Sequence, residues 1–333
     1  MPVIANTFQT TSAVGNREEL SDVVSRITPE DTPIYSLIPK ETAKSVHPEW
    51  ETDELAAPAD NKQVEGDEYT FGETTPPERL GNYTQILRKE GSISNTQETV
   101  DEAGPVQKVK YQKLKKGVEL RKDVEFSILA ANASTAGTTR ASGSLSTWLE
   151  ENVSRGNSGA NGGYNTGTGL TVAPTNGDQR AFSKAIMDDV MKQGYESGAN
   201  FGHVVVSPYV KSVFVTFMSD SNVASFRYAA SNGKNNSIVA TADVYEGPFG
   251  KVMIHPDRVM SAGSTPAARA RNAFFIDTEM LSWKWLRKIK EDKELAKTGD
   301  AKKFVLIGEG CLCVKNEKGL GVAADLFGLT AST

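Results

Sequence analysis

The chain has 333 residues, of which 38% are hydrophobic and 24% are charged, so it can bury a sizeable core in one or two domains, and disorder throughout is excluded. No run approaches the roughly 20 apolar residues of a membrane-spanning helix, and the first residues lack a secretory signal, so we expect a soluble chain that is intracellular when it is made, without a membrane partner. The net charge is −5, yet residues 1–105 carry 20 acidic and 8 basic side chains, whereas residues 106–333 carry 22 and 29.

Residues 1–48 are predicted to form an N-terminal arm. The apolar spacing of Leu20–Ile27 predicts a short helix that ends before Pro29, and the following prolines favour an extended chain. Three apolar side chains of this extended part have little local structure in which to become buried: Ile34, Tyr35 and Leu37. We therefore expect the arm to lie across its own domain or across a neighbouring subunit.

Residues 49–105 are acidic and rich in turn residues. Tyr69 and Phe71 alternate with polar residues, as do the residues around Ile86, which predicts a long two-stranded excursion. A two-stranded ribbon with so few apolar residues is marginal in water. This hairpin therefore needs a partner, and Tyr69 and Phe71 are candidates for subunit contacts.

Residues 106–141 begin with the clearest helix of the sequence, predicted at 106–131 between Gly104-Pro105 and a run of small residues. Its residues 106–122 contain one acid, Glu119, and seven bases: Lys108, Lys110, Lys113, Lys115, Lys116, Arg121 and Lys122. A solvated polar face and a face directed at phosphates or carboxylates explain this pattern about equally well.

Residues 142–272 combine loops with an α/β portion. Leu145–Leu149 suggest a short helix, and the polar segment 154–177 is predicted to be a mobile loop or one ordered by contact. Phe182, Ile186 and Val190 have the spacing of a helix that ends near Gly194 or Gly198. The strand 203–207, a helix capped by Ser207-Pro208 and two short strands around Gly247–Gly250 follow. Residues 273–333 supply a strand with alternating Leu281, Trp283 and Trp285, then a β-hairpin or bent strand pair at 302–326.

Known catalytic and cofactor motifs are not recognisable in the chain. His47, His203 and His255 lie far apart in sequence, and no nucleophile elbow is present. Cys311 and Cys313 are two apart in one predicted strand, where a mutual disulfide would be strained, so we expect reduced structural thiols. The basic aromatic segment Trp283–Lys290 fits an amphipathic strand better than a nucleic-acid site. We predict no catalytic residue, metal or cofactor.

The order of parts resembles the major capsid (major head) proteins of tailed double-stranded DNA bacteriophages. Four segments carry the closest likeness: SRITPEDTPIYSLIPK at 25–40, VYEGPFGKVMIHPDRVM at 244–260, FFIDTEMLSWKWLRKI at 274–289 and LAKTGDAKKFVLIGEGCLCVKNEKG at 295–319. The resemblance implies an α+β capsid fold with an N-arm (1–48), an E-loop hairpin (49–105), a spine helix of the P-domain (106–141), an α/β A-domain (142–272) and return strands of the P-domain (273–333). It is closest to the smaller subfamily without a fused protease or scaffold segment.

The resemblance implies a structural protein of the virion that assembles with itself, as hexamers and pentamers, into an icosahedral shell around the genome. Separate scaffold, portal and decoration proteins are possible further partners, with weak non-specific contact to packaged DNA. We expect the acidic hairpin to meet the basic helix of an adjacent subunit, through Lys113, Lys115, Lys116, Arg121 and Lys122. The alternatives are a soluble α/β enzyme with a long acidic lid, or another virion protein such as a decoration or tail subunit.

Overall fold

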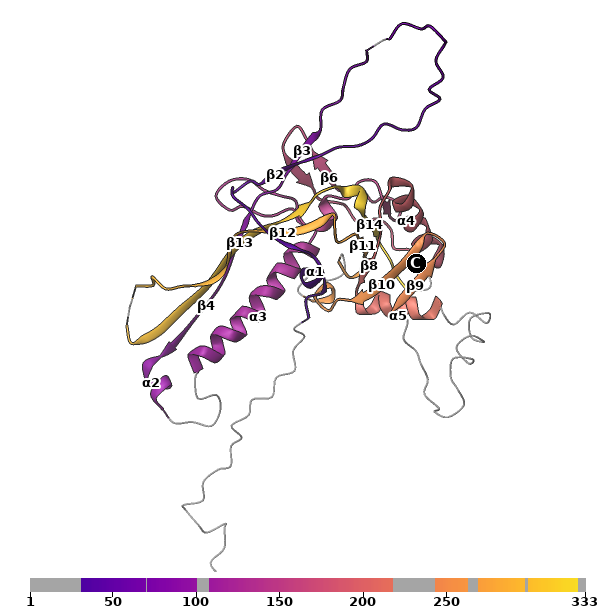
Figure 1. Cartoon of the computed structure of the whole chain (residues 1–333). Coiled ribbons are helices and arrows are strands. Elements are labelled where there is room, and N and C mark those ends of the chain that lie inside the picture. The colour runs from indigo at the N-terminus through magenta and orange to yellow at the C-terminus, as the bar shows by residue number, and fades with distance from the viewer. Residues whose placement is uncertain are drawn as a thin grey trace, which may run out of the picture.

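The computed structural model describes residues 31–69, 71–100, 108–217, 243–262, 269–296 and 299–328. Figure 1 shows a body from which two parts extend: a limb containing the longest helix, and a long loop on the opposite side. The helix predicted at Leu20–Ile27 lies outside the described residues.

The limb combines a four-stranded sheet with α3 (Lys108–Leu129), which packs along the sheet and confirms the predicted long helix over its described part. The strand order is β1 (Lys40–Thr42), β12 (Leu281–Asp292), β13 (Ala301–Val314) and β4 (Gln85–Ser94). Strands β12, β13 and β4 are antiparallel, whereas β1 runs parallel to β12. Residues of β4 alternate between half-buried and exposed because α3 covers one face. The short α2 (Asn95–Thr99) follows β4 and is capped by Ser94.

The body contains a six-stranded sheet. Its order is β5 (Val153–Ser154), β14 (Leu320–Ala323), β11 (Ala273–Ile276), β8 (His203–Val206), β10 (Gly250–Pro256) and β9 (Val244–Gly247). Helix α4 (Lys184–Ser197) packs on β14 and β5, and α5 (Pro208–Phe217) packs on β8 and β10. The predicted succession of helix, strand and helix is confirmed, as are the two short strands around Gly247–Gly250.

The six-stranded sheet separates two hydrophobic cores, because successive side chains of a strand point to opposite faces. Val205 and Phe274 lie in the core that also contains Trp148 and Trp283. Their neighbours in sequence, among them Phe275, lie in the core under α4 and α5. The run of apolar residues in β8 and β11 is thus explained by burial on both faces.

Two helix ends follow from single residues. Gly198 ends α4 with a φ of 87°, the left-handed conformation that glycine adopts at little cost. Ser207 precedes Pro208 and accepts a hydrogen bond of 3.2 Å on its hydroxyl from the backbone N–H of Val210. Both termini agree with the sequence-based prediction.

One local prediction is wrong, and two are confirmed only in part. Pro33 does not keep the arm extended but begins the short α1 (Pro33–Leu37), because proline suits the first turn of a helix. Residues 302–326 do not form a hairpin, since β13 and β14 belong to different sheets and are joined by the turn η4 (Glu317–Gly319). Leu145–Leu149 contain only the 3-10 turn η2 (Leu145–Thr147).

The predicted acidic hairpin is also paired differently. The two-stranded sheet is short and joins β2 (Glu49–Thr52) to β3 (Glu78–Gly81), while Tyr69 and Phe71 lie in no strand. The residues around Ile86 belong to β4 and pair with β13 instead. Long-range pairing with the C-terminal part of the chain therefore overrides the local alternation.

The segment 154–177 is ordered by contact, which was one of its two predicted states. It forms the hairpin β6 (Gly163–Asn165) and β7 (Leu170–Val172). The ring of Tyr164 stacks on Trp148 at 5.3 Å, and the hydroxyl of Thr171 accepts a 2.8 Å hydrogen bond from the N–H of Ser134. Another short turn, η3 (Val259–Ser261), follows β10.

Candidate functional site

The described residues contain no cluster of three or more His, Cys, Asp or Glu side chains that could hold a metal ion. The fold brings His203 and His255 together, with 3.0 Å between Nδ1 and Nε2, a pair that their separation in the sequence did not suggest. Cys311 and Cys313 are free and buried, and burial raises the pKa of both thiols. Within the described segments, no helix is long and apolar enough to cross a membrane.

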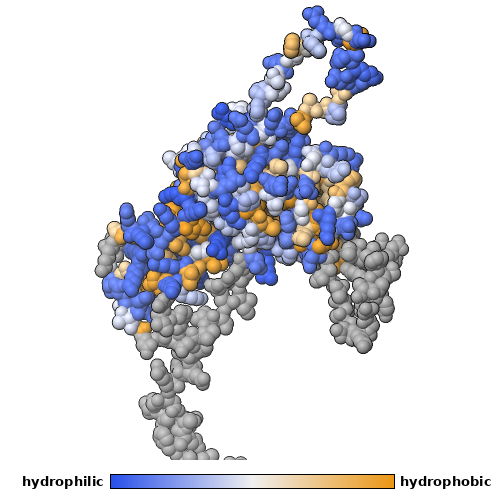
Figure 2. Space-filling view, in the orientation of Figure 1, coloured by the Kyte–Doolittle hydropathy of each residue, from blue (hydrophilic) through white to orange (hydrophobic). Residues whose placement is uncertain are grey.

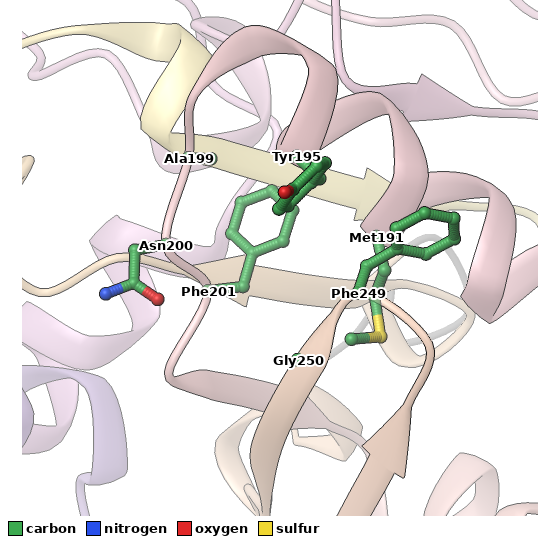
Figure 3. Close-up of a pocket in the computed structure, with 7 residues that line it drawn as sticks. All are labelled: Met191, Tyr195, Ala199, Asn200, Phe201, Phe249 and Gly250. Atoms are coloured by element: carbon green, nitrogen blue, oxygen red, sulfur yellow. The ribbon is translucent and has the colours of Figure 1, made fainter.

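A small pocket of about 250 Å³ lies where the end of α4 meets the turn between β9 and β10 (Figure 3). Aromatic, apolar and small residues line it, with Asn200 and the hydroxyl of Tyr195 as polar groups: Met191, Tyr195, Ala199, Asn200, Phe201, Phe249 and Gly250. The lining contains no carboxylate, imidazole or thiol. This pocket therefore has no acid and base pair for catalysis.

A loop at residues 53–77 projects from the body between β2 and β3 (Figure 1). It carries seven acidic residues and one lysine, Lys62, which pairs with Asp60. Tyr69 is 89% exposed and Phe71 is 96% exposed, and two aliphatic residues, Leu55 and Val64, are exposed as well. The described residues of the chain do not cover these apolar groups. This projecting loop is a surface that another molecule can bury.

The root of the projecting loop is held firmly. Lys318 pairs with Glu54 at 2.7 Å. The carboxylate of Glu309, on β13, is only 3% exposed and accepts hydrogen bonds from Thr84, Arg140 and Arg287. These bonds connect the residues after β3 to β12 and β13. The loop therefore extends from a fixed base.

A groove of about 810 Å³ runs between α3 and β12, on the limb. Its wall on α3 consists of residues at three- and four-residue spacing, which share one face of a helix: Lys110, Lys113, Leu114, Gly117, Val118 and Arg121. The other lining residues come from the arm, β12 and β13: Tyr35, Lys40, Trp285, Lys288, Ile289, Glu291 and Leu306. Figure 2 shows the same mixture of apolar and hydrophilic residues on the limb.

The groove has an apolar floor and a basic rim. Leu114, a large aliphatic residue of the lining, is 66% exposed. Glu291 is the acidic residue in the lining, and Lys113 neutralises it at 2.6 Å. Lys40, Lys110, Arg121 and Lys288 remain as excess positive charge. An acidic segment with apolar side chains fits this combination.

Only some of the candidate contact residues predicted from sequence line the groove. Tyr35, Lys113 and Arg121 line the groove, whereas Lys115, Lys116 and Lys122 do not. Lys116 bonds Glu119 at 2.8 Å. Leu37 is half-buried at the end of α1. The helical spacing from Lys113 to Arg121 could have indicated Leu114, Gly117 and Val118 as well. Ten of the lining residues were not among the predicted contact candidates: Lys40, Lys110, Leu114, Gly117, Val118, Trp285, Lys288, Ile289, Glu291 and Leu306.

The structure corrects the prediction that Ile34 is a candidate for contact with a neighbouring subunit. Its side chain is fully buried in the core of its own chain, next to α3, so it is not available to a neighbouring subunit. Of the two partners considered for the arm, its own domain covers this residue. The burial arises because α1 turns Ile34 and Ile38 toward the same core.

The chain matches the SU10 major capsid protein family over residues 4–327. The major capsid protein of Escherichia phage Phieco32 is 35% identical over 122 residues, which span 36% of this chain and about a third (35%) of that protein.

Two solved structures show the same fold at low sequence identity. The capsid asymmetric unit of cyanophage A-1(L) has a TM-score of 0.62 at 10% identity and covers 96% of this chain and 98% of its own. The capsid asymmetric unit of cyanophage Pam1 has a TM-score of 0.60 at 12% identity, and the match covers 99% of this chain and 100% of the Pam1 chain.

These similarities confirm the α+β capsid fold and disfavour the enzyme reading, since the family is structural. Over nearly its whole length, the chain belongs to the SU10 major capsid protein family, whose members form the shells of phage heads.

Proposed function

We propose that this capsid protein assembles by placing the projecting loop of one copy in the groove between α3 and β12 of a neighbouring copy. The observation that carries the proposal is the complementarity of two surfaces on one chain. The loop is acidic and exposes Tyr69 and Phe71, and the groove has a basic rim around an apolar floor.

Physical arguments support a pairing between copies. Aromatic side chains that enter an apolar pocket supply much of the affinity of a protein interface. Opposite charges around such a pocket steer the encounter and fix its orientation. Loop and groove are different surfaces, so each copy can give its loop to one neighbour and receive a loop from another. Such a head-to-tail contact closes into rings when its rotation allows.

The remaining parts of the proposal concern the shell. Rings of six and five copies, closed by this contact, build an icosahedral head that encloses double-stranded DNA. Contact with that DNA is weak and sequence-independent, consistent with a net charge of −5. Scaffold, portal and decoration proteins are further proposed partners. The five proposed segments remain 1–48, 49–105, 106–141, 142–272 and 273–333.

Electron microscopy and light scattering of the recombinant full chain test the proposal. We expect shells, tubes or rings from the native sequence. The variant R121E/K288E, which reverses two rim charges, is expected to stay unassembled with an unchanged helical circular dichroism signal. K122E is the matched control, because Lys122 is a base on the same helix that does not line the groove.

A charge-swap experiment identifies the loop as the occupant. The loop variant D67K/E68K should also fail to assemble. A single chain that carries all four substitutions, D67K/E68K and R121E/K288E, should form particles again. Normal particles from R121E/K288E alone, or equal damage from K122E, would contradict the proposed contact. Replacing Tyr69 and Phe71 by Ser should weaken assembly at every salt concentration, since their contribution is not electrostatic.

The absence of a fused protease or scaffold segment is a separate proposal. It predicts that the chain in mature particles has the mass of this sequence, 35.9 kDa. Intact-mass spectrometry of the particle subunit tests it. A larger precursor in immature particles would overturn it.

A further inference from the structure

Two histidines and a methionine share one face of the six-stranded sheet. Strands β8 and β10 run parallel, and their register places Met253 beside His203 and His255 beside Val205. Register partners lie on the same face of a sheet, and so do residues that are two apart on one strand. The side chains of His203, Met253 and His255 therefore leave these two strands on the same side.

The two imidazole rings are already in contact. Nδ1 of His203 lies 3.0 Å from Nε2 of His255, and the ring centres are 5.1 Å apart. One nitrogen of this hydrogen bond donates, and the other accepts with the lone pair that a metal ion would use. A tetrahedral metal ion with metal–nitrogen distances of about 2.0–2.1 Å holds two such nitrogens about 3.3 Å apart. A slight opening of the pair therefore admits one ion between the rings.

The protonation of the pair suits metal binding. Burial, together with the nearby His203 and Lys211, lowers the pKa of His255 below its ordinary value of 6.5, so this ring is neutral at pH 7. Metal binding needs neutral imidazole. When an ion enters, the hydrogen that bridges the two rings moves to the other nitrogen of its own ring. Two neutral rings thus bind the ion without a net release of protons.

Met253 supplies a third donor atom. Its side chain is 47% exposed, although it is apolar, and it lies directly across from His203 and two residues before His255. A methionine side chain is unbranched and turns about three bonds, so its sulfur can reach an ion held by neighbouring residues. Thioether sulfur is a soft ligand that carries no proton and favours Cu(I).

The surroundings disfavour a divalent ion. Both carboxylates on the adjoining strand and on the residue before it are matched with a lysine. Asp243 pairs with Lys211 at 2.8 Å, and Glu246 lies opposite Lys251 in the register of β9 and β10. The ammonium group of Lys211 also acts on His255 as a positive charge. Coulomb repulsion by this charge is half as large for a monovalent ion as for a divalent one.

We propose that His203, His255 and Met253 form a binding site for one Cu(I) ion per chain. The two imidazole nitrogens and the thioether sulfur would bind the ion, which would join β8 to β10 and stabilise the body by mass action. The site is independent of the proposed contact between copies, because none of these residues belongs to the projecting loop or lines the groove.

A competition titration tests the site. The recombinant full chain is titrated without oxygen, with ascorbate as reductant, against the coloured Cu(I) chelator bicinchoninate. We expect the chain to withdraw one equivalent of Cu(I). His255→Gln should weaken binding by at least about 100-fold, since even partners outside the ligand set contribute about 10- to 100-fold. His47→Gln is the matched control, because His47 stacks on Tyr83 and has no second imidazole beside it in the described residues.

Met253→Leu tests the third ligand. This variant should keep the fold, because the side chain is half-exposed, and it should weaken Cu(I) binding by about tenfold or more. X-ray absorption at the copper edge should show two nitrogen ligands and one sulfur ligand in the native protein. The sulfur signal should be absent in Met253→Leu. Unchanged affinity in this variant, or a persisting sulfur signal, would overturn the proposed ligand set.

The buried thiols are the competing explanation for any bound copper. Cys311 and Cys313 are fully buried, so replacing both by Ala should leave the affinity for Cu(I) unchanged. Loss of binding in that variant while Met253→Leu still binds normally would overturn the site. Tighter binding of Zn(II) than of Cu(I), or equal weakening by His47→Gln and His255→Gln, would overturn it as well. Cu(I) should also raise the Tm of the native chain more than that of Met253→Leu.

Discussion

The indole Nε1 of Trp50 donates a hydrogen bond of 2.8 Å to the backbone carbonyl of Val314. Trp50 lies in β2, at the root of the projecting loop, and Val314 is the last residue of β13. The two are 264 residues apart in sequence. The bond therefore fastens the loop to the C-terminal strands and determines the direction in which it leaves the body.

Replacing Trp50 by Phe should loosen this root. The variant keeps an aromatic ring near Trp148, whose ring centre is 5.7 Å from that of Trp50, but it loses the N–H donor and leaves the carbonyl of Val314 unpaired. We expect a loss of about 1–2 kcal/mol in the free energy of unfolding. Urea denaturation measures it, and limited proteolysis should show faster cleavage within 53–77. Unchanged stability and cleavage would contradict a role in the root.

The sequence predicts those elements of the fold that are determined by residues close together in the chain, and it does not predict the pairing of distant segments. Helix α4 was predictable because its apolar spacing and the glycine that ends it lie in one segment. The partner of β4 was not, because β13 follows it by about 200 residues and nothing near Ile86 specifies that pairing. Alternation predicts a strand, but it does not identify the neighbour.

Of the two candidate contact surfaces, the projecting loop could be predicted from the sequence and the groove could not. Exposure of Tyr69 and Phe71 followed from an acidic segment with too few apolar residues to form a core. The groove was missed because five of its thirteen lining residues come from β12 and β13, which only the tertiary fold brings to α3. The burial of Ile34 depends likewise on the carboxylate of Glu125, 91 residues away.

Two glycines in helices should respond oppositely to alanine. Alanine favours a helix over glycine by about 1 kcal/mol. At Gly117 the added methyl group meets only Leu306, at 4.0 Å, so Gly117→Ala should stabilise the protein by about 0.5–1 kcal/mol. At Gly194 the methyl group would collide with the ring of Phe201, so Gly194→Ala should destabilise it by about 1–3 kcal/mol. Thermal unfolding of both variants checks the difference, and equal shifts would refute the packing argument.

The histidine pair should make the body sensitive to mild acid. Burial, together with the nearby His203 and Lys211, lowers the pKa of His255 below its ordinary value of 6.5. The unfolded chain then binds a proton that the folded chain does not, so stability should decrease as the pH falls below about 6.5. His255→Gln, which cannot ionise, should lose less stability between pH 7 and pH 5. Denaturant titrations at each pH measure this, and parallel curves for the two proteins would count against it.

Glu309 should control stability at lower pH. Burial opposes its ionisation, but hydrogen bonds from Thr84, Arg287 and Arg140 outweigh burial and lower its pKa below the ordinary value of 4.5. A lowered pKa contributes stability above the unfolded value, and this stability is lost as the pH falls through the folded value. Glu309→Gln leaves two guanidinium groups without their carboxylate. Because Arg287 is 43% exposed, the cost at pH 7 should be about 2–3 kcal/mol, below that of a fully buried pair.

The same variant separates charge from packing. Glutamine keeps the shape of the side chain and can still accept from Thr84, so the difference from the native protein should shrink as the pH falls below about 4.5. Urea unfolding from pH 7 to pH 3 follows that convergence. The control is Glu90→Gln, whose carboxylate is exposed on β4 and pairs with Arg88 at 3.7 Å, an arrangement that contributes little stability. A constant difference at all pH values would mean that the shape of the Glu309 site, and not its charge, holds the root of the loop.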